Sequence, residues 1–207
     1  MAANSDLEIE IKIQLESFMD YLKLLGYLGP IDRNEYHHNA FFDTPDRQLG
    51  QAGYALRVRS AELSGSVTLK SLVSQTDALA VRQEVIGEIG AVMARAIIDG
   101  HTDLMSLNVA PITFLRSHFP GLTPVLLLQF RNERHIKRYH LGELELDLEI
   151  DRTEFCDGSV EYELEIELPD EKHYQSVHDG VARMFQSLAI PLVTQTRSKF
   201  ERALAHK

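Results

Sequence analysis

The chain has 207 residues, 44% of them hydrophobic, and a formal net charge of −10 at pH 7. This length suits one domain over residues 1–207, and the acidic balance argues against binding nucleic acid or an anionic membrane through a broad basic surface. The single cysteine, Cys156, excludes an intrachain disulfide and a cysteine-based zinc site. The first residues lack a signal-peptide pattern, and no apolar run reaches the ~18 residues of a membrane span. We therefore expect a soluble protein of the cytoplasm.

The first predicted strand, roughly Leu7 to Leu15, carries the stretch Glu8-Ile9-Glu10-Ile11-Lys12. Side chains alternate between the two faces of a strand, so both glutamates and the lysine share one face and the isoleucines share the other. Taken alone, the pattern is typical of a surface strand with its polar side in water. Whether this charged face has a function depends on the residues that the other strands carry.

The next segments predict one helix and four more strands. Ser17–Leu28 is expected to be an amphipathic helix, with Phe18, Leu22 and Leu25 at helical spacing. Alternation and turn residues predict strands over Glu35–Phe42, Tyr54–Arg59, Ser66–Val73 and Leu79–Ile89.

The second half of the chain starts helical and then returns to sheet. Ala91–Ile98 and Ile112–Phe119 show helical spacing and separate two groups of strands. The later elements are strands over Val125–Tyr139, Glu143–Phe155 and Val160–Leu168 and helices over Glu171–Leu188 and Gln195–Ala205.

Most of these strands alternate charged with aliphatic residues, and some strands are basic while others are acidic. If the apolar faces pack against helices, the charged faces must point either to bulk water or into an enclosed lumen. A closed antiparallel barrel provides such a lumen. Arginine and lysine bind phosphate oxygens, and carboxylates bind Mg²⁺ or Mn²⁺. A barrel lined with both kinds of residue is therefore expected to bind a polyphosphate.

Eight short motifs resemble, in order, those of the CYTH superfamily, the triphosphate tunnel metalloenzymes. Glu8-Ile9-Glu10-Ile11-Lys12 resembles the ExExK signature of that family. The others are Phe42-Asp43-Thr44-Pro45, Ala55-Leu56-Arg57-Val58-Arg59, Thr68-Leu69-Lys70, Arg82-Gln83-Glu84, Leu148-Glu149-Ile150-Asp151, Glu163-Leu164-Glu165-Ile166-Glu167 and Ser198-Lys199-Phe200. The match spans nearly the whole chain.

This resemblance implies an α+β fold: an eight-stranded antiparallel closed β-barrel, or tunnel, with helices packed outside. It implies that Mg²⁺ or Mn²⁺ is bound by Glu8, Glu10, Asp151, Glu165 and Glu167. It implies that phosphate is bound by Lys12, Arg57, Arg59, Lys70, Arg82, Arg131, Arg134 and Lys199. Lys12, Glu10 and Lys199 would be catalytic, with Glu10 or Glu167 positioning the attacking water. Arg131 and Arg138 remain alternatives to Arg134, and Glu149 and Glu163 are expected to orient rather than ligate.

The Phe42-Asp43-Thr44-Pro45 turn and the Leu56-Arg57-Val58-Arg59 strand most resemble those of the inorganic triphosphatases. They imply hydrolysis of inorganic tripolyphosphate to pyrophosphate and phosphate, with a small-molecule triphosphate as partner and a homodimer as an expected assembly. A class IV-type adenylyl cyclase or a thiamine triphosphatase remains open, because each needs the same metal–triphosphate site. A non-catalytic polyphosphate-binding module is a further alternative, because Ile86 stands where many relatives carry the second acid of an R-x-E-x-E segment.

Overall fold

The structure is a computed structural model that describes residues 6–75 and 80–206, with the backbone alone for residues 6–8, 72–75 and 80–82. The described strands are β1 (Asp6–Leu15), β2 (Arg33–Asp43), β3 (Tyr54–Ser60), β4 (Ser64–Gln75), β5 (Ala80–Gly90), β6 (Val125–Leu141), β7 (Leu144–Glu154), β8 (Val160–Glu167) and β9 (Val193–Thr194). The α-helices are α1 (Phe18–Leu28), α2 (Gln48–Gln51), α3 (Ala91–Ile98), α4 (Ala110–His118), α5 (Tyr174–Ser187) and α6 (Lys199–Ala205). Short 3₁₀ turns lie at Leu104–Ser106 and Glu171–His173.

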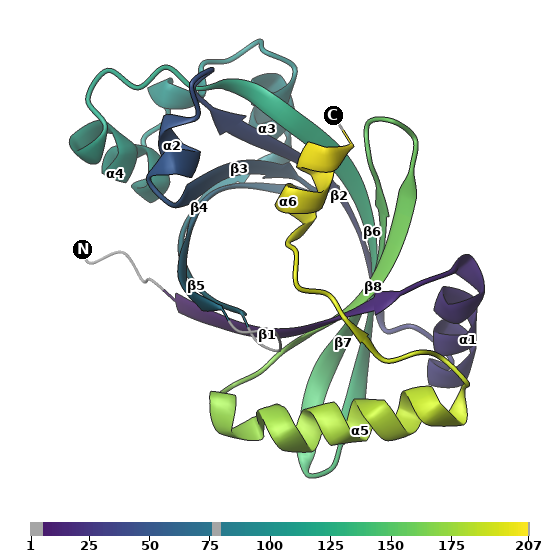
Figure 1. Ribbon diagram of the computed structural model, residues 1–207. Helices are drawn as coiled ribbons and strands as arrows, with labels where there is room; N and C mark the ends of the chain where they lie inside the picture. The colour runs from purple at the N-terminus through teal and green to yellow at the C-terminus, as the bar shows by residue number, and fades with distance from the viewer. Residues whose placement is uncertain (1–5, 76–79, 207) are drawn as a thin grey trace.

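All the strands belong to one antiparallel sheet in the order β5-β4-β3-β2-β6-β7-β8-β1-β9. β1 also pairs with β5, residues 6–10 of the first lying beside residues 80–84 of the second. The sheet curves strongly, and its strands surround a central space in the view of Figure 1. The α+β fold is therefore as expected, but the described residues form nine strands rather than the eight predicted. The extra strand, β9, pairs only two residues with β1 and is too short to show alternation.

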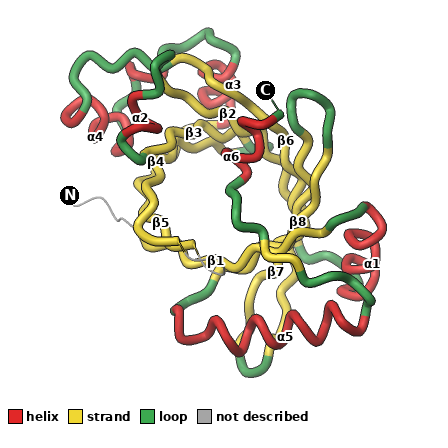
Figure 2. The backbone as a smooth tube through the Cα atoms, viewed as in Figure 1, coloured by secondary structure: helices red, strands yellow, loops and turns green. Residues whose placement is uncertain are grey.

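Two hydrophobic clusters attach the helices to the sheet. One joins α1 and α5 to β1, β7 and β8, and it includes Leu24, Leu148 and Phe185. The other joins α2, α3 and α4 to β2, β3 and β4, and it includes Leu56 and Ile112. Figures 1 and 2 show these two groups of helices at opposite sides of the sheet. Because the apolar side chains of the strands face these helices, the charged side chains face the interior.

Helix α1 differs from its prediction in the face that it buries. Its buried apolar residues are Tyr21, Leu24 and Leu28, whereas Phe18 and Leu22 are 52% and 42% exposed. Both faces of this helix carry large apolar residues, so spacing alone does not determine which one packs. Among the described residues, no helix is both long enough and apolar enough to cross a bilayer.

Helix α6 lies against the end of β2 and β6 rather than wholly outside the sheet (Figure 1). Phe200 contacts Phe41, with ring centroids 4.7 Å apart, and Ala203 is buried in the same cluster. A capping box between Ser198 and Glu201 fixes the start of the helix. The first helical residue, Lys199, is thereby held toward the interior of the sheet.

The packing of α4 on the sheet depends on Gly87 in β5. A Cβ at this position would lie 2.6 Å from Val109 Cβ and 3.0 Å from Pro111 Cδ. We predict that Gly87→Ala lowers the free energy of unfolding by about 1–3 kcal/mol, because the start of α4 must move. Gly26→Ala in α1 is the matched control: its Cβ meets nothing within 4 Å, so alanine should stabilise by about 0.5–1 kcal/mol. Urea denaturation measures both, and stabilisation by Gly87→Ala would contradict this packing.

Candidate functional site

A cavity of about 700 Å³ lies inside the curved sheet. Its lining comes from β1 to β8 and from α6, so segments from both ends of the chain meet there. The predicted site residues that line it are Glu10, Lys12, Arg57, Arg59, Lys70, Arg134, Glu165, Glu167 and Lys199.

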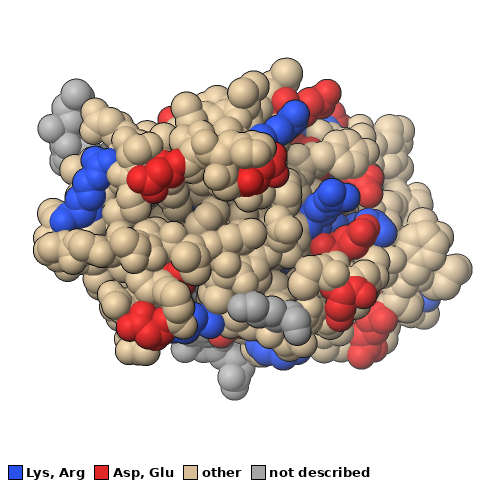
Figure 3. Space-filling view, turned by 90° about the horizontal axis from the view of Figure 1, so that it is seen from above, with Lys and Arg blue, Asp and Glu red and all other residues tan. Residues whose placement is uncertain are grey.

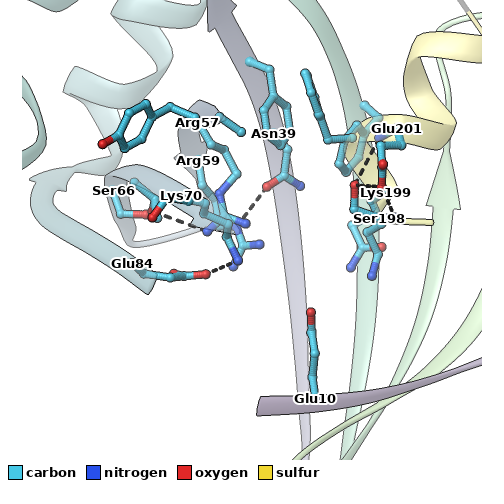
Figure 4. A pocket seen from close by; sticks show the side chains of 18 of the residues that line it. Glu10, Asn39, Arg57, Arg59, Ser66, Lys70, Glu84, Ser198, Lys199 and Glu201 are labelled. Carbon is cyan, nitrogen blue, oxygen red and sulfur yellow. Dashed lines mark hydrogen bonds and ion pairs between the residues drawn. The ribbon is translucent and has the colours of Figure 1, made fainter. Parts of the chain in front are cut away.

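One wall of the cavity is basic. Arg57 and Arg59 project inward from β3, and Lys70 projects from the neighbouring strand β4 (Figure 4). Asn39 accepts a hydrogen bond from Arg59 Nε at 2.9 Å, and Thr68 accepts one from Arg57 at 3.3 Å. Burial, together with the nearby cations Arg57 and Arg134, lowers the pKa of Arg59 to about 9. A bound anion would relieve this mutual repulsion of positive charges.

The opposite wall is acidic, and the strand register explains why. Asp151 of β7 lies directly opposite Glu163 of β8, and Glu149 lies opposite Glu165. Like charges that face one another across strands repel, so these pairs require cations nearby. The structure supplies the cations from three other elements: β1, β6 and α6.

Arg134 of β6 is the first of these cations. Its Nε donates to Asp151 Oδ1 at 2.8 Å, and its Nη2 lies 2.6 Å from Asp151 Oδ2. The same guanidinium pairs with Glu149 and Glu165. Burial opposes ionisation of Asp151, but Arg134 and Lys199 outweigh burial and lower its pKa. The arginine is therefore a buried bridge among three carboxylates.

Lys12 of β1 is the second cation. Its Nζ lies 2.9 Å from Glu10 Oε1 and 2.8 Å from Glu165 Oε1. Burial alone would raise the pKa of Glu165, but Lys12, Lys199 and Arg134 together hold it well below its usual range. Glu165 is thus fully ionised at neutral pH, although it is buried.

Glu149 differs from the other acids of this wall. Burial raises its pKa to about 7 against the opposing effect of Arg134, and the charges of Glu165 and Asp151 raise it as well. The protonation state of Glu149 therefore depends on what other charge the cavity contains.

Several predicted residues lie elsewhere. Arg131 alternates with Phe130 and Asn132, which line the cavity, so it points to the other face of β6 and is exposed. Arg138 is exposed and pairs with Asp147 at 2.8 Å. Asp151 is completely buried behind the lining. The side chains of Glu8 and Arg82 lie outside the described part of the structure, although the two residues are backbone partners.

Other residues of the site were not predicted as ligands. Asn39 and Asn132 are buried amides of the lining; Asn132 donates to Asp151 Oδ1 at 3.0 Å and accepts from Thr153 at 2.7 Å. Glu84 lies opposite Lys70 and pairs with it. Asn39 and Asn132 could have been identified from the sequence, because each is a neutral amide at an inward-facing position of a strand that also carries charged residues.

The acidic wall contains carboxylates of the kind that bind a hard divalent cation. Among the described residues, Asp151, Glu163 and Glu165 present carboxylate oxygens that all lie within 4.8 Å of one another. Glu10 and Glu167, which are backbone partners, line the cavity beside them. Carboxylate oxygens are the ligands that Mg²⁺ and Mn²⁺ prefer.

The face of the molecule shown in Figure 3 does not repeat this separation of charge. On the face shown in Figure 3, acidic and basic side chains are interspersed, with no single broad basic region. The basic residues Arg57, Arg59 and Lys70 instead line the interior.

The two faces of β6 provide a test of this arrangement. We predict that Arg134→Met lowers the free energy of unfolding by about 3–5 kcal/mol, because Asp151 loses a buried charge partner. Arg131→Met, three residues away on the exposed face, should change it by less than about 0.5 kcal/mol. Urea denaturation measures both variants. Equal losses in the two variants would contradict the inward placement of Arg134.

Comparisons with known proteins agree with this geometry. No curated protein matches the chain. Among solved structures, a Hippeastrum protein described as a candidate adenylyl cyclase with a dominant triphosphatase activity is 26% identical, with a TM-score of 0.84 over 97% of this chain and 96% of that one. A candidate adenylate cyclase from Bacillus halodurans is 22% identical, with a TM-score of 0.73 over 96% of this chain and 97% of that one.

A Pyrococcus horikoshii protein is 15% identical, with a TM-score of 0.60 over 96% of this chain and 99% of that one. At such low identity, the Bacillus and Pyrococcus structures support the fold alone. The family model of the CYTH domain matches residues 6–200, which is nearly the whole chain. This chain belongs to the CYTH family.

Proposed function

We propose that this protein is a metal-dependent triphosphatase that hydrolyses inorganic tripolyphosphate to pyrophosphate and phosphate. The observation that carries the proposal is the cavity with a basic wall of Arg57, Arg59 and Lys70 facing an acidic wall. A chain of phosphates with a divalent cation carries charges of both signs and is complementary to both walls. The similarity to the Hippeastrum protein supports a triphosphate as the substrate class.

The proposed site is a tunnel that the curved sheet encloses. The pairing of β1 with β5, in addition to its pairing with β8, supports this enclosure. An enclosed site excludes bulk water, and this strengthens the attraction between fixed cations and phosphate oxygens. Both walls can then act on the same anion.

Different residues are assigned to different parts of the substrate. Arg57, Arg59 and Lys70 bind the phosphate oxygens from the basic side, arginine through two parallel donors where geometry allows. Lys12, beside Glu10 and Glu165, donates a proton or a hydrogen bond to the bridging oxygen as pyrophosphate leaves. The P–O bond to this oxygen breaks as water bonds to the terminal phosphorus.

The carboxylates that line the cavity would hold Mg²⁺ or Mn²⁺, with Glu10, Glu165 and Glu167 as its ligands. When bound, the ion neutralises phosphate charge and polarises a water molecule. Glu10 accepts a proton from the attacking water and orients it toward phosphorus. No covalent enzyme intermediate is required.

An organic triphosphate is the second candidate substrate, because one part of the cavity is apolar. Phe41, Ala55, Phe130, Phe200 and Leu204 line it together with Tyr54. A bare tripolyphosphate needs no such surface, whereas the organic part of a nucleotide or of thiamine triphosphate does. Ile86, which is 48% exposed and lines the cavity between Glu84 and Glu88, also reduces the number of acids available there.

We predict that purified protein with Mg²⁺ or Mn²⁺ releases phosphate from tripolyphosphate faster than from ATP or thiamine triphosphate. We expect this order because the cations of the cavity would bind the phosphate oxygens, and tripolyphosphate consists of phosphate alone. Phosphate release and cyclic AMP formation are measured in the same reactions. Faster turnover of ATP with cyclic AMP as product would favour a cyclase. Tight binding of tripolyphosphate without turnover in either metal would favour a binding module.

We predict that Lys12→Met lowers kcat for tripolyphosphate by about 10²–10³-fold, because a cation that stabilises the leaving group is lost. The control is Lys23→Met: Lys23 lies on α1, is 39% exposed and pairs with Asp20, so the turnover of this variant should equal that of the wild type. Circular dichroism checks that both variants remain folded. Unchanged turnover in Lys12→Met would remove Lys12 from the reaction.

A further inference from the structure

Asp151, Glu163 and Glu165 have the composition of a metal site, but a side chain of the protein already contacts all three. Lys199 Nζ lies 2.7 Å from Asp151 Oδ2 and 3.0 Å from Glu165 Oε1, and it also pairs with Glu163. The ammonium group thus lies between the same carboxylates whose oxygens are within 4.8 Å of one another. Three carboxylates match the three donors of an ammonium group.

A second contact holds this arrangement in place. Arg202, one turn further along α6, is 1% exposed, and its Nη2 lies 2.6 Å from Glu163 Oε2. It also pairs with Glu161. Glu163 therefore lies between two cations of the same helix, and the helix cannot move away without leaving buried carboxylates unpaired. An unpaired buried carboxylate is strongly destabilising.

The charges around the cluster also disfavour an added divalent ion. Arg134 and Lys12 contact its members from β6 and β1, so that four cations, with Lys199 and Arg202, surround three carboxylates. Mg²⁺ requires oxygen atoms at about 2.0–2.1 Å, in the space that the ammonium group occupies. The two cannot bind the cluster together.

We propose that Lys199 is the resident cation of the Asp151–Glu163–Glu165 cluster and excludes a divalent metal from it. In this arrangement Asp151 positions Lys199 and Arg134, and Glu163 positions Lys199 and Arg202. The metal binds on the cavity side at Glu10, Glu165 and Glu167. Glu165 belongs both to the cluster and to the proposed metal site, so its contact with Lys199 also limits how strongly this glutamate binds a metal. The inference does not depend on the reaction, because it concerns metal binding without substrate.

Manganese titration followed by electron paramagnetic resonance tests the proposal in the full chain without substrate. Lys199→Met keeps much of the side-chain volume and removes the charge. We expect it to bind one additional Mn²⁺, or to bind Mn²⁺ about tenfold more tightly than wild type. Adding Glu163→Gln to Lys199→Met should abolish that gain. Lys172→Met is the control for removing an exposed lysine: Lys172 pairs with Asp170 at the surface, so this variant should bind Mn²⁺ as wild type does.

Glu163→Gln alone provides the decisive contrast. If Lys199 fills the cluster, this variant binds Mn²⁺ within about twofold of wild type, because Glu163 is not a ligand. A loss of about tenfold or more in a variant that circular dichroism shows to be folded would overturn the proposal, as would Lys199→Met binding no more Mn²⁺ than wild type. If Lys199→Met does not fold, the variants Glu163→Gln and Asp151→Asn test the proposal instead. We expect both to bind Mn²⁺ as wild type does.

Discussion

The structure depends on one buried network of ion pairs around Asp151. The antiparallel register places carboxylates of β7 and β8 opposite one another, which is unfavourable unless cations lie between them. Arg134, Lys12 and Lys199 supply those cations from β6, β1 and α6. The requirement for charge balance therefore joins the two ends of the chain, and the C-terminal helix forms part of the site.

The same constraint explains how an acidic protein can bind an anion. Its net charge is −10, but many of the inward carboxylates are neutralised within their own wall. On the facing wall Lys70 pairs with Glu84, while burial and the neighbouring cations Arg57 and Arg134 lower the pKa of Arg59. The helices on the outside contribute apolar contacts that keep the sheet curved around the cavity. The apolar faces of the strands thus pack against the helices, and the charged faces of the same strands form the site.

Much of this arrangement follows from period-two alternation, which predicted the strands and the inward position of residues such as Lys12, Arg57 and Glu165. The phase of β6 was less clear, because it begins with the apolar run Val-Leu-Leu-Leu, and its pairing with β2 is irregular near Phe41. Arg131 and Arg134 were therefore both plausible from the sequence. The packed face of α1, the short strand β9 and the contact of Lys199 with three carboxylates depend on tertiary packing, which local spacing does not contain.

The most direct test of the two-walled cavity is a crystal structure with a non-hydrolysable triphosphate such as imidotriphosphate. The account predicts that the phosphate oxygens lie within hydrogen-bonding distance of Arg57, Arg59 and Lys70, inside the sheet. Phosphate groups bound instead on the outer face of the sheet, for example beside Arg131, would contradict it.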